Sequence, residues 1–544
     1  MIIGKIVIFK TQIGWLLNKT PKTALFCLLF ILFTSLSGMK QNTSNQGVKR
    51  VYVEYADSTV FEKDNNPDVH VLKGSVRFRH DGTYMYCDSA YLYNENNSLE
   101  AFGNVRIEQG DTLFMYGDYL IYEGNLNLAK MRENVRMENN DVTLFTDHFN
   151  YDRNIDLAYY FEGGMLVDSL NELTSVYGQY SPNTKIATFK EQVTLTNPQF
   201  VLTSDTLEYN TVDKVASILG PTVIESDSGT IHSTKGWYNT VTEESTLFDR
   251  STVITKDGTK QITADTLFYN RLTGFGEAFS NMIINDTVKK VILMGNYGYY
   301  DELTEFAFAT DSAQFIEYSQ RDSLFLHADT LQMQSIGEER EIKAFYGVRI
   351  FREDLQAVAD SLQFNTKDST LYLYQNPVLW NTDYQITGDI IKILFNDSTI
   401  ERVYVLDRAF AMEQKDSTYF NQIKGRNLTA FFEGGELTQM DVEGNTETIY
   451  YPIEEKKLEF VGRNKTESTH MTIYVANRKP VKILWYPTPV SEMLPIPDLT
   501  PDLKFLSGFV NYDYLRPKSK EDIFSRPTMK TGDIPIPRRQ RTRR

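Results

Sequence analysis

The sequence predicts an all-β fold, built as one elongated domain of about twelve repeats of roughly thirty residues. Three observations predict it: apolar and polar residues alternate over long stretches, a Gly or an Asp interrupts each expected strand near its middle, and this pattern returns at a nearly fixed period. The 33 Tyr and 33 Phe residues also favour strands. Each repeat is predicted to be a hairpin whose two strands both bend at mid-length.

The stretch from Ser98 to Tyr122 shows the repeating unit most clearly. Residues 99–109 and 112–122 form two arms with the period-two alternation of half-buried strands. The dipeptide Gly110-Asp111 between the arms is a hairpin signal. Gly103 and Gly117 lie near the middle of the arms, where a Gly usually marks a bulge or a bend. The unit therefore resembles a sheet creased along one line.

An Asp recurs at the second crease of each unit, and we interpret it as structural. The clear copies are Asp88, Asp118, Asp147, Asp205, Asp265, Asp329, Asp360 and Asp389, and the weaker copies are Gln179, Lys235, Asn296 and Arg426. Paired carboxylates also serve as acid–base catalysts or calcium ligands. Because the weaker copies need no carboxylate, turn chemistry explains the series better: the side chain is expected to cap backbone N–H groups at the bend.

One face of the predicted sheet is a continuous apolar stripe. Counted from each crease, the second and fourth residues are mostly apolar: Leu120 and Tyr122, Phe149 and Tyr151, Leu207 and Tyr209, Leu267 and Tyr269, Leu331 and Met333, Leu362 and Phe364, Ile391 and Ile393. A crease folds this face onto itself, so the stripe either lines an open trough or closes as the dry core of a sandwich. Periodicity alone favours the core, because apolar stripes usually are cores.

The N-terminal residues 1–38 are predicted to be a signal peptide. Lys19 and Lys22 precede the apolar run Ala24–Leu36, which is short for a membrane-spanning helix and is followed by small residues. An uncleaved anchor is the alternative. Removing this segment deletes four lysines and no acid, so the net charge changes from −16 to −16 − 4 = −20. That charge argues against a nucleic-acid partner.

The remaining chain divides into four parts. Residues 39–68 are a polar segment with a possible edge strand at Arg50–Phe61, and residues 69–450 are the repeats. Residues 451–485 are expected to be terminal strands. Residues 486–544 form a Pro-rich tail with a short amphipathic helix at Asp502–Val510 and an arginine-rich end at Arg538–Arg544. That end is expected to be a solvated tail, or else to contact an anionic surface.

The sequence carries no signature of an enzyme, a metal site or a cofactor site. The six histidines have no metal-site spacing, and Cys87 is the single cysteine after residue 38. Nucleophile-elbow, P-loop and dinucleotide motifs are missing. We therefore expect no catalysis, no metal and no cofactor.

Several stretches resemble the OstA-like family, the organic-solvent-tolerance and LptA-type proteins of lipopolysaccharide transport. These stretches are AFGNVRIEQGDTLFMYGDYLIYEGN from Ala101, LTSDTLEYN from Leu202, ITADTLFYN from Ile262, AVADSLQFN from Ala357 and VEGNTETIYYP from Val442. The resemblance implies a V-shaped, half-open β-jellyroll whose apolar trough holds the acyl chains of lipid A. It also implies a periplasmic bridge to the inner- and outer-membrane transport components, which would pair with its edge strands.

Mapped onto this sequence, the resemblance gives a lining for the trough. The residues are Val105, Ile107, Leu120, Tyr122, Val135, Met137, Phe149, Tyr151, Leu207, Tyr209, Leu267, Tyr269, Leu331, Leu362 and Phe364. The chain departs from the family in length: about 24 strands at roughly 4.8 Å spacing predict a trough on the order of 115 Å long. Two alternatives stay open: an envelope scaffold with a dry core, and the periplasmic part of an outer-membrane translocon. A polysaccharide-acting solenoid enzyme would need a localised acidic cluster that breaks the repeat, and the sequence has none.

Overall fold

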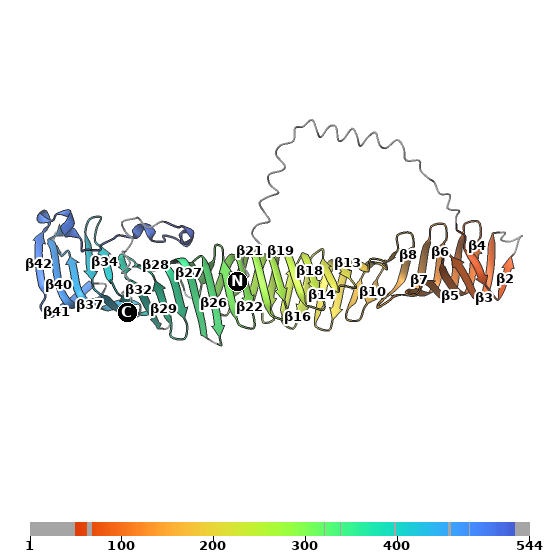
Figure 1. Ribbon diagram of the computed structural model, residues 1–544, viewed down its shortest axis with the longest axis horizontal. Coiled ribbons are helices and arrows are strands. Elements are labelled where there is room, and N and C mark those ends of the chain that lie inside the picture. The colour runs from red at the N-terminus through yellow and green to blue at the C-terminus, as the bar shows by residue number, and fades with distance from the viewer. Residues whose placement is uncertain are drawn as a thin grey trace, which may run out of the picture.

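The computed structural model describes residues 49–527, except for 62–67, 320, 338, 397–398, 455–458 and 478. Within this part of the chain, forty strands join into one antiparallel sheet. Figure 1 shows the sheet as a long row, with β2–β4 at one end and β40–β42 at the other. The all-β prediction is confirmed. The predicted signal peptide and the arginine-rich end lie outside the described residues.

The sheet has two arms, which meet at the crease. In the first long strand, residues 69–73 lie in arm A and residues 76–80 lie in arm B. The strands that follow divide between the two arms in the same way. The strands that run unbroken through both arms are β3 (Val69–His80), β4 (Thr83–Tyr93), β5 (Ser98–Gln109), β6 (Leu113–Glu123), β7 (Leu128–Asn139), β8 (Val142–Asp152), β13 (Ile186–Asn197), β14 (Phe200–Asn210), β19 (Glu244–Thr255), β20 (Lys260–Asn270), β21 (Phe275–Asp286), β22 (Val291–Asp301), β27 (Glu339–Arg352), β28 (Leu355–Asn365), β37 (Glu436–Tyr450) and β40 (Gly462–Ala476).

Elsewhere the crease divides a strand into two short pieces. The pieces in arm A are β2 (Ser58–Phe61), β9 (Leu157–Tyr160), β12 (Tyr177–Ser181), β15 (Val215–Ile218), β18 (Lys235–Asn239), β23 (Phe306–Thr310), β26 (Thr330–Ile336), β29 (Thr370–Tyr374), β32 (Ile390–Asn396), β33 (Thr399–Leu406), β36 (Asn427–Glu433) and β41 (Lys479–Tyr486). The pieces in arm B are β1 (Tyr52–Tyr55), β10 (Gly164–Val167), β11 (Glu172–Ser175), β16 (Thr222–Ser226), β17 (Gly229–Ser233), β24 (Gln314–Glu317), β25 (Leu324–His327), β30 (Val378–Asn381), β31 (Tyr384–Thr387), β34 (Phe410–Gln414), β35 (Phe420–Lys424) and β42 (Val490–Pro495). A separate pair is β38 (Ile453–Glu454) with β39 (Glu459–Phe460).

A two-residue bulge produces the crease in alternate strands. In β5, Gly103 and Asn104 have φ angles of 74° and 45° and lie opposite the single residue Asp118 of β6. Consecutive positive φ angles give the twist of a type I′ turn, which matches the right-handed twist of strands. The same pair of positive φ angles recurs at residues 74–75, 133–134, 162–163, 191–192, 249–250, 280–281, 311–312, 346–347, 375–376, 407–408 and 444–445. Local backbone geometry therefore repeats the crease along the whole sheet.

Two of the weaker crease copies were assigned to the wrong residues. The break between β11 and β12 is at Val176, whereas Gln179 lies inside β12 and pairs with Thr188. The break between β17 and β18 is at Thr234, one residue before Lys235. The corrected series from Asp118 to Thr234 has a constant interval of 29 residues. The sequence pattern did not reveal these two creases, because Val176 and Thr234 lack the carboxylate that marks the clear copies.

The arms fold onto each other and share one core. The core cluster extends from Val51 to Met471, takes side chains from both arms, and alternates with solvent-facing residues along each strand. The repeat also continues past residue 450, since β40 is itself a creased strand and pairs with β37 through both arms. No helix of the described residues is long and apolar enough to span a membrane.

After β42 the chain turns back and lies along the sheet over β28–β34 (Figure 1). We call residues 496–527 the strap. It contains the 3-10 turns η1 (Ile496–Asp498), η2 (Pro501–Lys504), η3 (Asp513–Leu515) and η4 (Asp522–Phe524). The helix predicted at Asp502–Val510 is wrong, because the chain is helical only over η2 and then extends, with Gly508 at a φ of 90°. The tail also contributes a strand, β42, which the sequence did not predict.

The strap covers the outer face of arm B. Leu506 packs with Phe410, Phe420 and Tyr451, and Tyr512 and Leu515 pack with Val358, Val378 and Trp380. Buried glutamines hold its backbone. Gln422 donates to the Lys504 carbonyl at 2.9 Å and accepts from the Leu506 N–H at 2.8 Å. Gln385 bonds in the same way to the Val510 carbonyl and the Tyr512 N–H.

Candidate functional site: the apolar trough and its mouth

The predicted lining residues all lie on the inner faces of the arms, and most are fully buried. Thirteen of the fifteen are at most 3% exposed, and only Tyr269 and Phe364 are partly exposed. From Leu72 to Ile218 the inner side chains of the two arms pack on one another and fill the space between them. In this section the stripe is a packed core.

Tyrosines form a column along the mouth, where the tips of the two arms meet. Tyr122, Tyr151, Tyr180, Tyr209 and Tyr238 follow one another at intervals of 29 residues, and each is at most 2% exposed. A buried phenol needs a partner for its hydroxyl group. In this column the partners come mainly from the turns at the arm tips, and several of them lie on the opposite arm.

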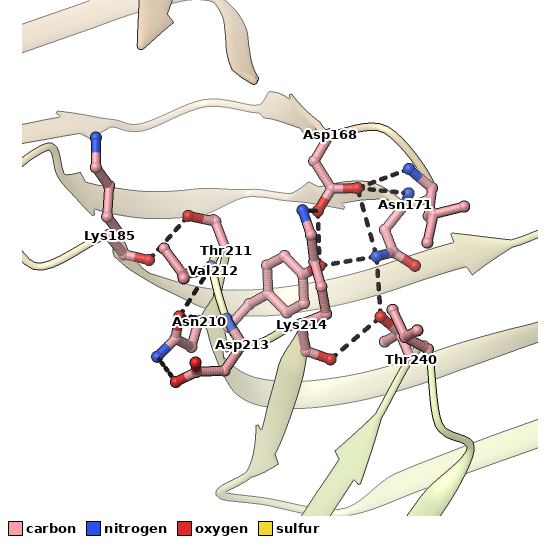
Figure 2. A network of polar contacts seen from close by, with 12 residues as sticks. Asp168, Asn171, Lys185, Asn210, Thr211, Val212, Asp213, Lys214 and Thr240 are labelled. Carbon is pink, nitrogen blue, oxygen red and sulfur yellow. Dashed lines mark hydrogen bonds and ion pairs between the residues drawn. The ribbon is translucent and has the colours of Figure 1, made fainter. Parts of the chain in front are cut away.

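The most extensive of these contacts surrounds Asp168, in the turn between β10 and β11 at the tip of arm B (Figure 2). Its carboxylate accepts hydrogen bonds from Tyr209 Oη at 2.6 Å and from Lys214 Nζ at 2.8 Å, both on arm A. The Leu170 and Asn171 N–H groups donate to its other oxygen, each at 2.8 Å. The Asn171 amide donates to Tyr209 Oη at 2.8 Å and to Thr240 Oγ1 at 3.1 Å.

The electrostatics of this cluster favour the ionised carboxylate. The Asp168 side chain has no exposed surface. Burial alone raises the pKa of Asp168, but the donors from Lys214, Tyr209 and the backbone outweigh it, and the net pKa is lowered. Burial and the neighbouring carboxylate raise the pKa of Tyr209, so its hydroxyl stays a donor. The cluster therefore joins the two arm tips by charge-assisted hydrogen bonds.

Similar contacts join the arm tips on either side of Asp168; we call the whole set the latches. His80 Nδ1 of arm B lies 2.6 Å from Tyr122 Oη of arm A, and Arg153 donates to the same hydroxyl at 3.0 Å. Tyr180 donates to Asn139 Oδ1 across the mouth at 2.9 Å, and Lys185 donates to the same oxygen. Burial raises the pKa of Tyr180 to about 12.

The mouth becomes less tightly closed from β19 onward. Val253, Ile262 and Tyr300 are only partly buried, and they line a cavity of about 70 Å³. The cross-arm contacts here are longer: Lys260 Nζ lies 3.3 Å from Tyr300 Oη, and Lys289 Nζ lies 3.2 Å from Ser335 Oγ. Apart from Glu454, no described residue after Ser335 forms a side-chain hydrogen bond or ion pair between the two arm tips.

The crease carboxylates lie on the outside of the fold, away from the trough. Asp88 accepts from the Asn104 side chain at 2.7 Å, Asp118 from that of Asn134 at 2.5 Å, and Asp265 from that of Asn281 at 2.6 Å. Backbone capping occurs at Asp147, which accepts from the Asn134 N–H at 3.0 Å. Elsewhere the partner is mostly a side chain: Thr206 for Asp205, Ser361 for Asp360, Arg408 for Asp389 and Arg526 for Asp329.

Tyr122, Tyr151 and Tyr209 were predicted from the sequence to lie on the inner face, whereas Tyr180, Tyr238 and the partners of the hydroxyl groups were not. Tyr122, Tyr151 and Tyr209 were interpreted as apolar lining, whereas their hydroxyl groups form part of the polar closure. A tyrosine returning at the fixed position of a buried stripe was an available signal, since an apolar lining needs no hydroxyl.

Parts of the chain are similar to known proteins. Residues 48–205 match the family model described as OstA-like protein. A crystal structure of LptH from Pseudomonas aeruginosa, the LptA homologous periplasmic component of a lipopolysaccharide transport device, matches at 12% identity. That match covers 21% of this chain and 79% of LptH, with a TM-score of 0.19. No curated protein matches the chain. Over residues 48–205, which contain the first creased hairpins and the first latches, the chain is similar to the OstA-like family.

Proposed function

We propose that this chain is a periplasmic bridge protein for lipopolysaccharide transport and outer-membrane assembly, which holds the acyl chains of lipid A between its two arms. The observation that carries the proposal is the single apolar core along the inner faces, which becomes partly exposed at the mouth after β19. The match of residues 48–205 to the OstA-like family model supports it. The proposal assigns no catalytic step to the chain.

The partly exposed inner residues explain why an acyl chain would bind. Phe364, Phe395 and Phe432 lie at the mouth with part of their surface in water. An acyl chain that covers these rings is itself removed from water. This burial stabilises the complex by about 0.8 kcal/mol per buried CH₂ group. The crease Asp residues, which keep the arms bent, serve this function only by shaping the trough.

The two ends of the sheet offer contacts to further transport components. β1 and β2 pair only with β3, and β41 and β42 only with β40, so each end has an edge without a described partner strand. Tyr52, Phe61, Val481 and Val490 are between 49% and 70% exposed on these strands. We propose that inner- and outer-membrane components add strands at these edges.

Site-specific photocrosslinking in cells tests the proposed function. The probe replaces Phe364, whose ring faces the trough, or its neighbour Gln363, whose side chain bonds to Glu341 on the outer face. We expect a lipopolysaccharide adduct at position 364 and none at position 363. An absence of adducts at both positions, in a folded and exported protein, would refute the proposal.

A second candidate is an envelope scaffold with a dry core. The packed section from Leu72 to Ile218 and its latches favour this function. A scaffold would give no adduct at Phe364, and removing it would alter envelope mechanics without lipopolysaccharide accumulating at the inner membrane.

A further inference from the structure

Resting on the proposed function, we infer that acyl chains bind only in one section of the trough, between β27 and β41. We call this the open section (residues 339–486). The latched section (residues 69–239) is held closed by the contacts across its mouth, and residues 244–336 form the transition between the two. The ligand is an amphiphile with ester- or amide-linked acyl chains.

The residues of the column along the mouth change between the latched section and the open section. In the latched section they are the buried tyrosines Tyr122, Tyr151, Tyr180, Tyr209 and Tyr238, and in the transition they are Tyr269 and Tyr300. From the end of the transition onward they are Met333, Phe364, Phe395 and Phe432, all partly exposed. These four side chains have no hydroxyl group, so they cannot take part in a hydrogen-bonded closure. The same column is therefore polar-tipped where the arms are joined and wholly apolar where they are not.

Opening the latched section would leave buried polar groups without partners. An acyl chain between the arms at Tyr209 has to separate the Asp168 carboxylate from the Tyr209 hydroxyl and the Lys214 ammonium group. An acyl chain replaces none of these hydrogen bonds, and a buried charge without a partner is strongly unfavourable. Phe364 and Phe395 present no such barrier, because a ring and an acyl chain contact each other without losing a hydrogen bond.

The strap supports arm B along the section in which the described residues form no latch, and it reaches the end of the transition. Its contacts run from β25, where the Phe524 and His327 rings lie 4.8 Å apart, through Arg349 in β27, which donates to the Leu515 carbonyl at 3.0 Å, to Arg463 in β40, which donates to the Leu503 carbonyl at 2.8 Å. The latches hold arm B from the inside of the mouth, whereas the strap holds it from the outer face. Arm B thus keeps its shape in the open section while the mouth stays accessible.

A cavity in the open section supplies the binding site. It has a volume of about 100 Å³ and lies between the arms, where Ile423, Met440, Met471, Ile473 and Trp485 line it. Methionines adapt their shape to an irregular apolar ligand. The Trp485 indole nitrogen is buried and has no hydrogen-bond partner among the described residues. A buried N–H group without a partner is rare in proteins, and the carbonyl oxygen of an acyl ester or amide would accept from it.

Photolabelling of the purified full-length protein tests the inference. The probe is lipid A with a diazirine at the end of one acyl chain, and labelled peptides are identified by mass spectrometry. We expect labels within residues 339–486 and none within residues 69–239. Labels in both sections would overturn the inference and leave the proposed function standing. A folded protein without any label would overturn both.

Two variants test the role of the indole N–H. Trp485→Phe keeps an aromatic ring and removes the N–H group, so we expect about fivefold weaker binding of lipid A. Trp237→Phe is the matched control in β18 of the latched section, and it should leave the affinity unchanged. Equal affinities of both variants and the native protein would refute the hydrogen bond to the ligand. Circular dichroism establishes that both variants are folded.

Discussion

Replacing Asp168 by Asn removes the charge from the most extensive latch and nearly keeps the shape of the side chain. One carboxylate oxygen accepts from both Tyr209 Oη and Lys214 Nζ, and the other accepts from the backbone N–H groups of Leu170 and Asn171. An Asn amide has a single acceptor oxygen. Whichever way it points, its NH₂ group faces donors, and at least one pair of hydrogen bonds is lost.

The expected loss of stability follows from the burial of these groups. Breaking a buried ion pair by removing one partner costs about 3–5 kcal/mol, and losing a hydrogen bond to a charged group costs about 1.5–3 kcal/mol. The Lys214 side chain is 18% exposed and can reach water after the change. We therefore expect the free energy of opening this latch to fall by about 2–4 kcal/mol.

Hydrogen exchange measured by mass spectrometry is the suitable assay, because a chain of repeats opens locally and not in a single transition. Peptides covering residues 168–171 and 211–214 should exchange faster in Asp168→Asn, whereas the open section should not change. The control is Asp168→Asn combined with Lys214→Met, which removes both charges and should recover more than half of the loss. Equal protection in Asp168→Asn and the native protein would refute the argument that a buried charge closes the mouth.

Three further predictions concern other parts of the fold. Gly103→Ala should lower the stability of its hairpin by about 1–3 kcal/mol in local hydrogen exchange, because the new Cβ would lie 2.6 Å from the Asp88 carboxylate. Gly82 has a similar positive φ angle but open space around it, so Gly82→Ala should lower the stability of its hairpin less. Gln422→Ala leaves the Leu506 N–H group of the strap without its partner and the Lys504 carbonyl with only Tyr451 Oη, at 3.2 Å, so residues 503–507 should become cleavable by protease while the sheet stays protected. Burial lowers the pKa of His80, so its latch is at full strength above the ordinary pKa of about 6.5 and weakens as the pH falls below that value. His80→Gln should remove this pH dependence of hydrogen exchange between pH 7 and 5.

The parts of the fold that repeat locally were predictable from the sequence. Alternation along each strand gives the inner and outer faces, and Gly103-Asn104 marks the bulge because Gly and Asn both tolerate a positive φ angle. The same signal is missing where Glu191-Gln192 take that conformation, because the surrounding ladder imposes it. The period itself makes those copies recognisable.

The contacts between the arms were not predictable by the same means. Asp168 lies in a polar turn like many others in this chain, and its partners Tyr209 and Lys214 follow 41 and 46 residues later. No local pattern connects them. The helix predicted at Asp502–Val510 failed for a related reason: its apolar spacing is helical, but the backbone there bonds to Gln422 and packs on arm B.

The strap also determines the order in which this chain is completed. Arg349 and Leu515 are separated by 166 residues, and Gln385 and Tyr512 by 127, whereas the sheet assembles from neighbours close in sequence. During synthesis, arm B is therefore finished before the segment that covers it. In that interval Val358, Trp380 and Phe410 present an apolar surface to the surroundings. Such transiently exposed surface is prone to aggregation, so this stage of folding is where a chaperone would matter most.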